Sequence, residues 1–392
     1  MTRPRLLFYC QHSLGLGHLS RSLALCSSLS ERFKVVLLCG GKLPKAIKPP
    51  DGVELVMLPP LGATIEGRII SHDARRSLDR ARELRRELIL RTFRSAQPEA
   101  LMIEFFPFGK KRFKAELLPL LEEAKDLGAK APLVVCSIRD ILVSRGPEQQ
   151  DHDDHASDLA NRYFDAVLIH SDPGFARLEE SFRPRLPLRT PIYYTGFVVP
   201  NGSSSNGSPQ RGQKIVVSAG GGIVGAQLLR AAIRARRLLA EDVEMKVVAG
   251  PFLPEVTWRS LRAEAAGTNG LTLQRSVKSL SAELRTASAS VSQCGYNTAL
   301  DILRARVPAL VVPFSDSGED EQTKRAGRLQ AAGAVRVLDP HDLEPLALAK
   351  EIRALLSFRP RPVPVDLNGG PRTARILDVL HSGRFGILMD WR

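Results

Sequence analysis

Several features are scarce in this sequence, and each scarcity excludes a class of protein. Its 392 residues include only five cysteines, an odd and scattered set at positions 10, 26, 39, 136 and 294. We expect reduced thiols in the core of a cytoplasmic protein, because these cysteines form neither a disulfide framework nor a zinc motif. No apolar run approaches the roughly 20 residues that a membrane-spanning helix needs. The stretch after Arg3 and Arg5 is also too short for the apolar core of a secretory signal.

Acidic residues are outnumbered by basic ones, and the formal net charge is +14 at pH 7. A charge of this sign suits nucleic acid, an anionic membrane surface or phosphorylated substrates. No zinc finger, helix-turn-helix or basic motif interleaved with aromatic residues accompanies the charge, so we expect no nucleic-acid partner. The chain is long enough for two domains, and its 43% hydrophobic and 25% charged residues are those of a globular protein.

Short apolar segments alternate with amphipathic stretches along the whole chain, which is the pattern of parallel, doubly wound α/β sheets. The strand candidates are Arg5–Cys10, Lys34–Cys39, Val53–Leu58, Ala100–Phe105, Leu133–Ser137, Ala166–His170, Lys214–Ser218, Met245–Ala249, Leu271–Gln274, Ala289–Ser292, Ala309–Pro313 and Val335–Leu338. This pattern predicts two Rossmann-like domains, residues 1–199 and 214–392, joined by a Gly/Ser/Asn-rich linker at 200–213. The last helix is expected to pack back on the first domain.

A turn with three consecutive glycines, Gly220, Gly221 and Gly222, opens the second half. It follows the strand candidate Lys214–Ser218 and precedes a helical run from Val224 to Leu239. Glycines here let the backbone approach a phosphate, and a helix N-terminus supplies unpaired N–H groups. The stretch matches neither GxGxxG nor GxxxxGK[ST]. A phosphate-binding turn is the hypothesis, and a tight turn that needs glycine is the structural alternative.

A more specific stretch reads SQCGYNTALDILRARVPALVVPF and is followed from Glu319 by EDEQTKRA. It places small and polar residues at the end of the strand candidate Ala289–Ser292 and at the start of the next helix: Gln293, Cys294, Gly295, Asn297 and Thr298. Asn297 and Thr298 can cap the helix or bond an anion. Asp301, one turn later, can bind the vicinal hydroxyls of a ribose. Glu321 and Gln322 carry acceptor and donor groups that suit the hydroxyls of a sugar.

This segment resembles the donor-binding box of the GT-B nucleotide-sugar glycosyltransferases. In plant UDP-glycosyltransferases that box reads HCGWNS-x-x-E, then G-V-P, then D/E-Q. Here residues 293–298 read QCGYNT, followed by Asp301, by Arg306-Val307-Pro308 and by Glu321-Gln322. Gln293 replaces the histidine and Arg306 the glycine of the plant box. The layout of both halves also resembles the N-acetylglucosaminyltransferase family of peptidoglycan lipid synthesis, which has a family-28 C-terminal domain.

The resemblance implies a GT-B fold with the nucleotide-sugar, expected to be a UDP-sugar, in the C-terminal domain and the acceptor in the N-terminal domain. It also implies that the glycine turn at 220–222, with Gly295, Asn297 and Thr298, meets the diphosphate. Asp301 would then meet the ribose, and Glu321 with Gln322 the sugar. The reaction implied is a direct displacement with inversion. We expect no metal and no cofactor, since helix N-termini and glycine loops offset the charge of the leaving diphosphate.

The first loop of the chain, with Gly15, Gly17, His18 and Arg21, is implied to face the acceptor. An imidazole with a pKa near neutrality can take the proton of the acceptor hydroxyl, so His18 is the candidate general base. A histidine that only caps or packs at the helix start is the alternative. Arg21 is a candidate contact for a phosphate or the acceptor, or an exposed helix residue.

Further candidates and alternatives concern the acceptor side and the reaction. Arg139 and Asp140 follow a strand candidate, and Asp140 is either a second base or orienting group, or an ordinary helix-start aspartate. His152 and His155 are flanked by acids, and we interpret them as part of a polar surface rather than a metal site. A basic helix over Ala74–Arg94 is either a solvated amphipathic helix or a contact with anionic lipid on the inner face of the membrane. A nucleotide-sugar hydrolase and a non-catalytic nucleotide-sugar-binding protein stay open as alternative functions.

Overall fold

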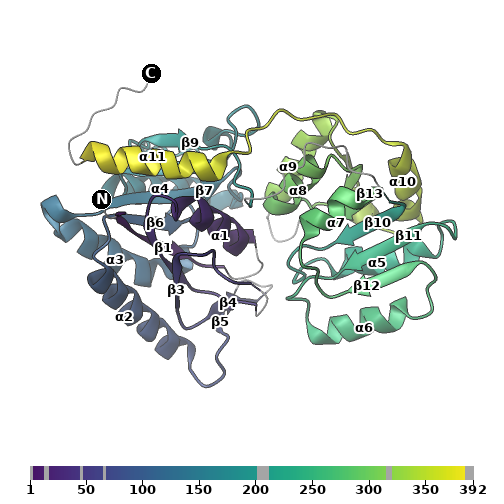
Figure 1. Cartoon of the computed structure of the whole chain (residues 1–392), viewed down its shortest axis with the longest axis horizontal. Coiled ribbons are helices and arrows are strands. Elements are labelled where there is room, and N and C mark those ends of the chain that lie inside the picture. Colours follow the sequence, from purple (N-terminus) through teal and green to yellow (C-terminus); the bar gives the residue numbers. More distant parts are fainter. Residues whose placement is uncertain are drawn as a thin grey trace. The chain divides into compact units, whose positions relative to one another are not determined.

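The computed structural model describes residues 3–12, 17–44, 47–64, 68–200, 212–314 and 320–384. It divides into two compact units, each with a parallel sheet and flanking helices (Figure 1). Unit 1 contains the described residues up to 12, from 18 to 200 and from 365 to 384, and unit 2 contains Gly17 and those from 212 to 364. Almost all of the predicted linker lies outside the described residues. The expected α/β class with two Rossmann-like domains is confirmed.

The sheet of unit 1 has the strand order β3-β2-β1-β6-β7-β8-β9, and all its pairings are parallel. Its strands are β1 (Arg5–Cys10), β2 (Lys34–Cys39), β3 (Val53–Met57), β6 (Ala100–Glu104), β7 (Leu133–Arg139), β8 (Ala166–His170) and β9 (Ile192–Tyr194). A small antiparallel hairpin, β4 (Leu61–Ala63) with β5 (Ile69–Ser71), follows β3. The chain continues from β1 to β2 on one side and returns to β6 on the other side of β1, which makes β1 and β6 the switch point of the sheet. Ligands bind at the carboxyl ends of the strands at such a point.

Helices cover both faces of this sheet because alternate residues of its strands are apolar on both sides. Leu7 and Tyr9 pack on one face with α2 (Leu78–Ala96), α3 (Lys114–Asp126) and α4 (Gln149–Tyr163). Leu6 and Phe8 pack on the other face with α1 (Gly17–Leu29) and α11 (Gly369–Arg384). The last helix of the chain, α11, therefore completes the core of unit 1 (Figure 1).

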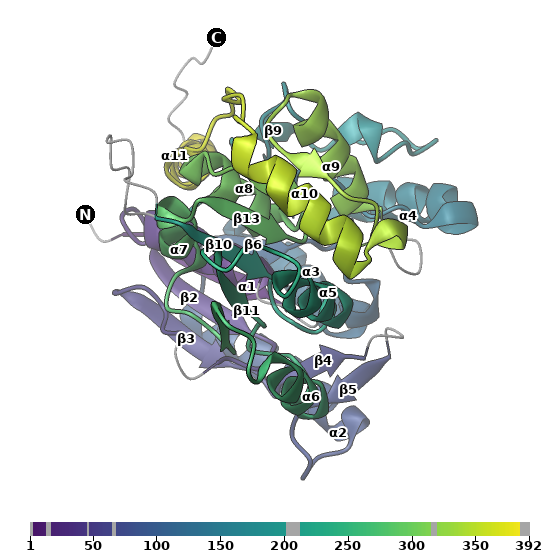
Figure 2. The ribbon, with the colours of Figure 1, turned by 90° about the vertical axis from the view of Figure 1, so that its right-hand side faces the viewer.

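Unit 2 is built on a parallel sheet with the order β12-β11-β10-β13-β14-β15. Its strands β10, β11 and β13 are labelled in Figure 2. Its strands are β10 (Lys214–Ser218), β11 (Glu244–Val248), β12 (Leu271–Gln274), β13 (Ala289–Ser292), β14 (Ala309–Val311) and β15 (Arg336–Val337). Its helices are α5 (Ala226–Arg236), α6 (Glu255–Ala265), α7 (Leu280–Thr286), α8 (Tyr296–Ala305), α9 (Glu321–Ala331) and α10 (Pro345–Ser357). The switch point lies between β10 and β13, so the glycine turn and the box residues leave the same edge of the sheet.

The expected basic helix differs from the observed one in its start and in its buried face. It begins at Leu78 rather than Ala74, because the hydroxyl of Ser77 accepts a hydrogen bond from the Arg80 N–H and caps the first turn. The fully buried residues of α2 are Ala81, Arg85, Ile89 and Phe93. Arg85 is thus an interior residue of a helix expected from the sequence to be basic and in contact with solvent or lipid. None of the described helices is both long and apolar enough to cross a membrane.

Candidate functional site

A buried carboxylate and a histidine meet at the switch point of unit 1. Glu104 is the last residue of β6, and its side chain is fully buried. His18, in the first turn of α1, is 19% exposed, and its Nδ1 lies 2.5 Å from Oε1 of Glu104. A carboxylate accepts hydrogen bonds, so this geometry places the proton of a neutral imidazole on Nδ1. The lone pair of Nε2 is then left to accept a proton, as a general base requires.

Arg21 donates a hydrogen bond to the same oxygen of Glu104, and it is buried. The expectation of an exposed helix residue is therefore wrong for Arg21, because one turn of α1 carries it inward to the carboxylate. A contact of Arg21 with a phosphate or the acceptor stays a prediction. Burial alone raises the pKa of Glu104, but His18 and Arg21 outweigh it and lower that pKa to about 2. Burial, only partly opposed by Glu104, also holds the pKa of His18 well below its usual 6.5. His18 is therefore a neutral imidazole at pH 7, with a lower pKa than the sequence suggested.

The Phe105 ring holds the other side of the His18 ring. The two rings meet edge to face, with centroids 5.4 Å apart, and the Arg139 guanidinium lies 5.4 Å from the Phe105 centroid. The backbone of Phe105 has φ 72°, a conformation that costs a bulky residue about 1–3 kcal/mol. Gly109 leaves room for the Phe105 ring, since a Cβ at this position would lie 2.2 Å from it. This strained residue directly follows Glu104 and fixes the imidazole between an aromatic edge and a carboxylate.

The remaining acceptor-side candidates are Asp140, Gly17 and Gly15. Asp140 directly follows β7 and is 2% exposed, and the carboxylate that bonds to His18 is Glu104, not Asp140. A role of Asp140 as a second base stays a prediction. Gly17 is the first residue of α1, whereas Gly15 lies outside the described residues. Sequence reasoning missed Glu104, although a carboxylate at the end of the apolar run ALMIE was the available signal.

In unit 2 the predicted glycine turn follows β10. Gly222 has φ 89°, and a Cβ added there would lie 2.6 Å from the carbonyl oxygen of Ala249, so close backbone packing explains this glycine. The carbonyl oxygen of Gly221 accepts a hydrogen bond from the Phe252 N–H at 3.0 Å. Gly220 has φ 58°, and no atom lies within 4 Å of a Cβ built on it. Within the described part of the chain, Gly220 therefore borders open space.

The predicted donor box begins at the end of β13, the strand next to β10. The amide nitrogen of Gln293 lies 3.2 Å from the place of a Cβ on Gly225, the residue before α5. Gly295 precedes α8, whose first turn contains Asn297 and Thr298, both partly exposed. No described atom lies within 4 Å of a Cβ built on Gly295. The N-terminus of α8 therefore has room beside it, and its N–H groups and dipole suit an anion.

Gln322, the second residue of α9, joins this box to the next loop. Its Oε1 accepts hydrogen bonds from the N–H groups of Cys294 at 3.0 Å and Phe314 at 3.1 Å. The neighbouring Glu321 is 6% exposed, and its carboxylate lies 4.0 Å from the guanidinium of Arg325. Arg325 in turn donates to the carbonyl oxygen of Cys294 at 2.8 Å. The structure thus brings the predicted sugar-binding pair to the box, and their contact with a sugar stays a prediction.

Asp301 lies one turn into α8, and its carboxylate is hydrogen-bonded to Ser281 of α7. Burial raises the pKa of Asp301 to about 6, although Arg304 and Ser281 act in the opposite direction. A partly buried carboxylate with few charged neighbours gains most from two hydroxyl donors, which is what a ribose diol offers. The geometry is therefore compatible with the predicted ribose contact.

The two histidines that could have suggested a metal site lie in α4. Nδ1 of His152 is 3.5 Å from a carboxylate oxygen of Asp153, and Nε2 of His155 is 3.2 Å from the Lys114 ammonium. An ammonium group at a ring nitrogen disfavours a metal cation there. In the residues that the structure covers, no cluster of three His, Cys, Asp or Glu side chains could hold a metal ion.

Known proteins with similar sequences point to sugar transfer. Residues 220–369 match the family model of the glycosyltransferase family 28 C-terminal domain. Two similar relatives are named UDP-N-acetylglucosamine–N-acetylmuramyl-(pentapeptide) pyrophosphoryl-undecaprenol N-acetylglucosamine transferase. The protein of Alkalilimnicola ehrlichii is 24% identical over 211 residues, 50% of this chain and 59% of that protein. That of Methylococcus capsulatus is 31% identical over 156 residues, 39% of this chain and 43% of that protein. The chain thus spans about half the length of the curated relatives it matches.

Solved structures resemble the whole chain in fold. The calicheamicin glycosyltransferase CalG4 is 18% identical and has a TM-score of 0.60, with 99% of this chain and 100% of that chain covered. MurG of Acinetobacter baumannii is 16% identical and has a TM-score of 0.56, with 96% and 99% covered. The chain therefore has the GT-B glycosyltransferase fold, carries a family 28 C-terminal domain, and is similar to the peptidoglycan N-acetylglucosaminyltransferase family.

Proposed function

We propose that this chain is an inverting glycosyltransferase that moves a sugar from a UDP-sugar to a hydroxyl group of an acceptor. The observation that carries the proposal is the hydrogen bond between Nδ1 of His18 and the buried carboxylate of Glu104. It leaves Nε2 of a neutral imidazole as a base, in the unit that the family resemblance assigns to the acceptor. The family 28 domain over residues 220–369 supports a nucleotide-sugar donor in the other unit.

The reaction that we propose is a single displacement. Nε2 of His18 takes the proton of the acceptor hydroxyl while the oxygen attacks the anomeric carbon. The bond from this carbon to the diphosphate oxygen breaks, and the diphosphate leaves with the electron pair. The Glu104 carboxylate stabilises the imidazolium that forms, and Arg21 keeps that carboxylate ionised through the buried hydrogen bond that it donates.

The donor side of the proposal rests on the residues around the start of α8. The open space beside Gly295 and Gly220 lets a diphosphate approach backbone N–H groups without a side chain in the way. Asp301 is proposed to bind the ribose, and the positive end of the helix dipole to offset the charge of the leaving group. UDP is proposed because the names of the curated relatives specify a UDP-linked sugar.

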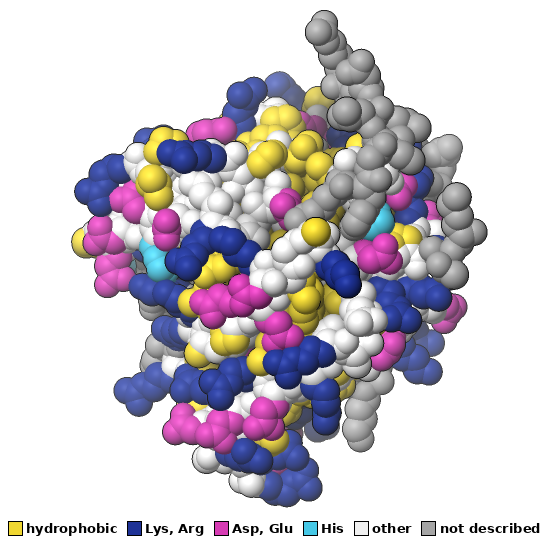
Figure 3. All heavy atoms as spheres, turned by 90° about the vertical axis from the view of Figure 1, so that its left-hand side faces the viewer, with side chains coloured by type: hydrophobic (Ala, Val, Ile, Leu, Met, Phe, Trp, Pro, Cys, Tyr) yellow, Lys and Arg dark blue, Asp and Glu magenta, His cyan; other side chains and the backbone are white. Residues whose placement is uncertain are grey.

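The acceptor that we propose is a lipid-linked or glycan hydroxyl, and the protein is proposed to work in the cytoplasm. The relatives named above act on a pyrophosphoryl-undecaprenol acceptor. The proposal also includes contact with an anionic membrane, although part of the positive charge of α2 is paired. The arginines of α2 include several paired with acids, such as Arg80 with Glu83 and Arg94 with Glu123. Figure 3, which views the left-hand side of Figure 1, shows Lys and Arg side chains interspersed with Asp and Glu.

A panel of nucleotide sugars tests the proposal. Each compound is added to the protein, binding is measured by the thermal shift, and UDP release is measured with and without acceptors such as octyl glycosides. Release that depends on an acceptor and yields an inverted glycoside is the expected result. Equal release of free sugar without any acceptor would show a hydrolase instead. Binding without turnover of any donor would show a non-catalytic binding protein.

A further inference from the structure

His12, two residues after β1, is a buried histidine to which the proposed reaction gives no role. It leaves the sheet of unit 1 at the same edge as Glu104, because β1 and β6 are neighbours and Tyr9 pairs with Ile103. Its side chain is almost fully enclosed, with the residue only 3% exposed. Lys110 and Glu104 act electrostatically on His12, and the same two groups act on His18. The two histidines therefore share one local environment.

The hydrogen bonds of His12 define its tautomer. Nε2 lies 3.0 Å from the carbonyl oxygen of Lys42, and a carbonyl oxygen only accepts, so Nε2 carries the proton. In the neutral ring Nδ1 is then an acceptor. Nδ1 has no hydrogen-bond partner among the residues that the structure describes, and it is buried. Leaving such a buried acceptor unpaired is unfavourable, and a suitable donor group would recover the lost hydrogen-bond energy.

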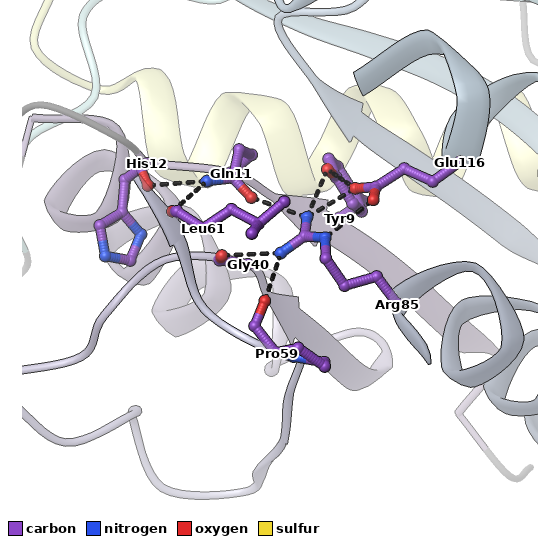
Figure 4. A network of polar contacts seen from close by, with 8 residues as sticks. All are labelled: Tyr9, Gln11, His12, Gly40, Pro59, Leu61, Arg85 and Glu116. Carbon is purple, nitrogen blue, oxygen red and sulfur yellow. Dashed lines mark hydrogen bonds and ion pairs between the residues drawn. The ribbon is translucent and has the colours of Figure 1, made fainter. Parts of the chain in front are cut away.

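The chain holds His12 in place through a network centred on Arg85 (Figure 4). Gln11 donates to the carbonyl oxygens of His12 at 2.8 Å and of Leu61 at 3.1 Å, and its own oxygen accepts from Arg85 at 2.8 Å. The Arg85 guanidinium also bonds to four other residues: Tyr9, Glu116, Gly40 and Pro59. The loops after β1, β2 and β3 are thereby tied to one buried cation.

Glycine on the next loop completes the support of the His12 ring. A Cβ on Gly41 would lie 2.5 Å from Nε2 of His12, so only glycine lets the two loops approach. In Figure 4 the His12 ring points away from the Arg85 guanidinium, with its backbone bound to the network and its ring outside it. A side chain anchored at one ring nitrogen and unpaired at the other has the form of a preorganised binding group.

We propose that Nδ1 of His12 accepts a hydrogen bond from a hydroxyl or amide N–H group of the sugar acceptor that unit 1 binds. The inference rests on the proposed function, which places the acceptor in this unit. His12 is then a binding residue that selects acceptors with a neutral donor group at this position, and Arg85 is a positioning residue that acts through Gln11. The proton on Nε2 excludes a role of His12 as the base at that nitrogen.

Two substitutions separate a ligand role from a structural one. The amide of glutamine in His12→Gln reaches the place of Nε2, keeps the bond to Lys42 and loses the acceptor at Nδ1. The shorter side chain in His12→Asn offers an oxygen near the place of Nδ1 and loses the bond to Lys42. The exposed His341 of unit 2, changed to Gln and to Asn, provides matched controls. The probes are methyl and octyl glycosides of glucose and N-acetylglucosamine.

The measurement uses the full chain with ¹⁵N-labelled histidine. We expect a saturating glycoside to move the NMR signal of His12 Nδ1 and not that of His341. We also expect its Kd to rise about tenfold in His12→Gln and to change less in His12→Asn, since the hydrogen bond from the ligand to Nδ1 is lost in the first variant only. Thermal unfolding shows whether each variant is folded.

Three results would overturn the inference. In the first, none of the four glycosides moves the Nδ1 signal. In the second, the signal of the free protein already has the shift of a bonded nitrogen and does not change, which means that water fills the place. In the third, the Asn variant weakens binding as much as the Gln variant, which makes His12 structural. A wild-type protein that releases no UDP from any donor contradicts the proposed function instead, whatever the NMR signal does.

Discussion

The substitution Glu104→Gln tests the proposed mechanism most directly. It keeps the size of the side chain and an oxygen that can accept the Nδ1 hydrogen of His18, but it removes the negative charge that stabilises the imidazolium. The charge centres of the two groups are about 4 Å apart when Nδ1 and Oε1 are in hydrogen-bond contact. Two unit charges at that distance interact by about 4 kcal/mol at an effective dielectric constant of 20. Since each 1.36 kcal/mol is tenfold in rate, we expect kcat to fall about 10³-fold.

The assay is UDP release under saturating donor and acceptor, with donor affinity from the thermal shift as a control. Donor affinity is expected to stay within about twofold, because Glu104 belongs to unit 1 and the family 28 domain to unit 2. Glu104→Asp keeps the charge and is the matched variant, with a smaller expected loss. Breaking a buried ion pair costs about 3–5 kcal/mol of stability, so circular dichroism is used to check that each variant is folded. A folded Glu104→Gln protein with near-normal kcat would refute the role of the carboxylate.

Four further outcomes are expected. The pKa of His18 is lowered to about 3, so the acid limb of the pH–rate profile should lie below pH 6.5. Removing the proposed base in His18→Ala should lower turnover by about 10² to 10⁴. Both pKa values are lower in the folded protein, so it binds fewer protons than the unfolded chain between pH 6.5 and about 3 at His18 and between pH 4.5 and about 2 at Glu104. The free energy of unfolding, measured with urea, should therefore decrease as the pH falls through these two ranges. Asp301→Ala should weaken UDP-sugar binding by about 1.5–3 kcal/mol in a calorimetric titration, and unchanged affinity would remove it from the ribose role. Turnover should survive EDTA, whereas loss of activity that magnesium or manganese restores would contradict the helix-dipole account of the leaving group.

The fold could be predicted because buried parallel strands are continuous apolar runs, which show in the sequence. Arg5–Cys10 and Lys34–Cys39 were predicted to the residue for this reason. The short edge strand β9, Ile192–Tyr194, and the hairpin β4–β5 were missed, because strands of three residues carry too little apolar pattern to distinguish a strand from a loop.

The donor box was visible because its residues lie close together in the sequence, around one strand end. The partner of His18 was not, because Glu104 is 86 residues away and only the pairing of β1 with β6 brings the two to one edge. The same holds for Arg85, which local sequence places on a basic helix and tertiary structure places in the interior. Contacts that depend on sheet order cannot be read from a single sequence by periodicity.

The position of α11 has a consequence for synthesis on the ribosome. Ala374 and Leu377 fill the core of unit 1 together with Leu6 and Phe8, yet residues 212–364 are translated between them. At about 5–20 residues per second, unit 1 waits roughly 10–30 s for its last helix after its strands have emerged. During that time α1 can already pack on this face of the sheet, but the part that α11 covers stays exposed, while unit 2 can already fold. The half of the chain that is made first is therefore the last to be completed.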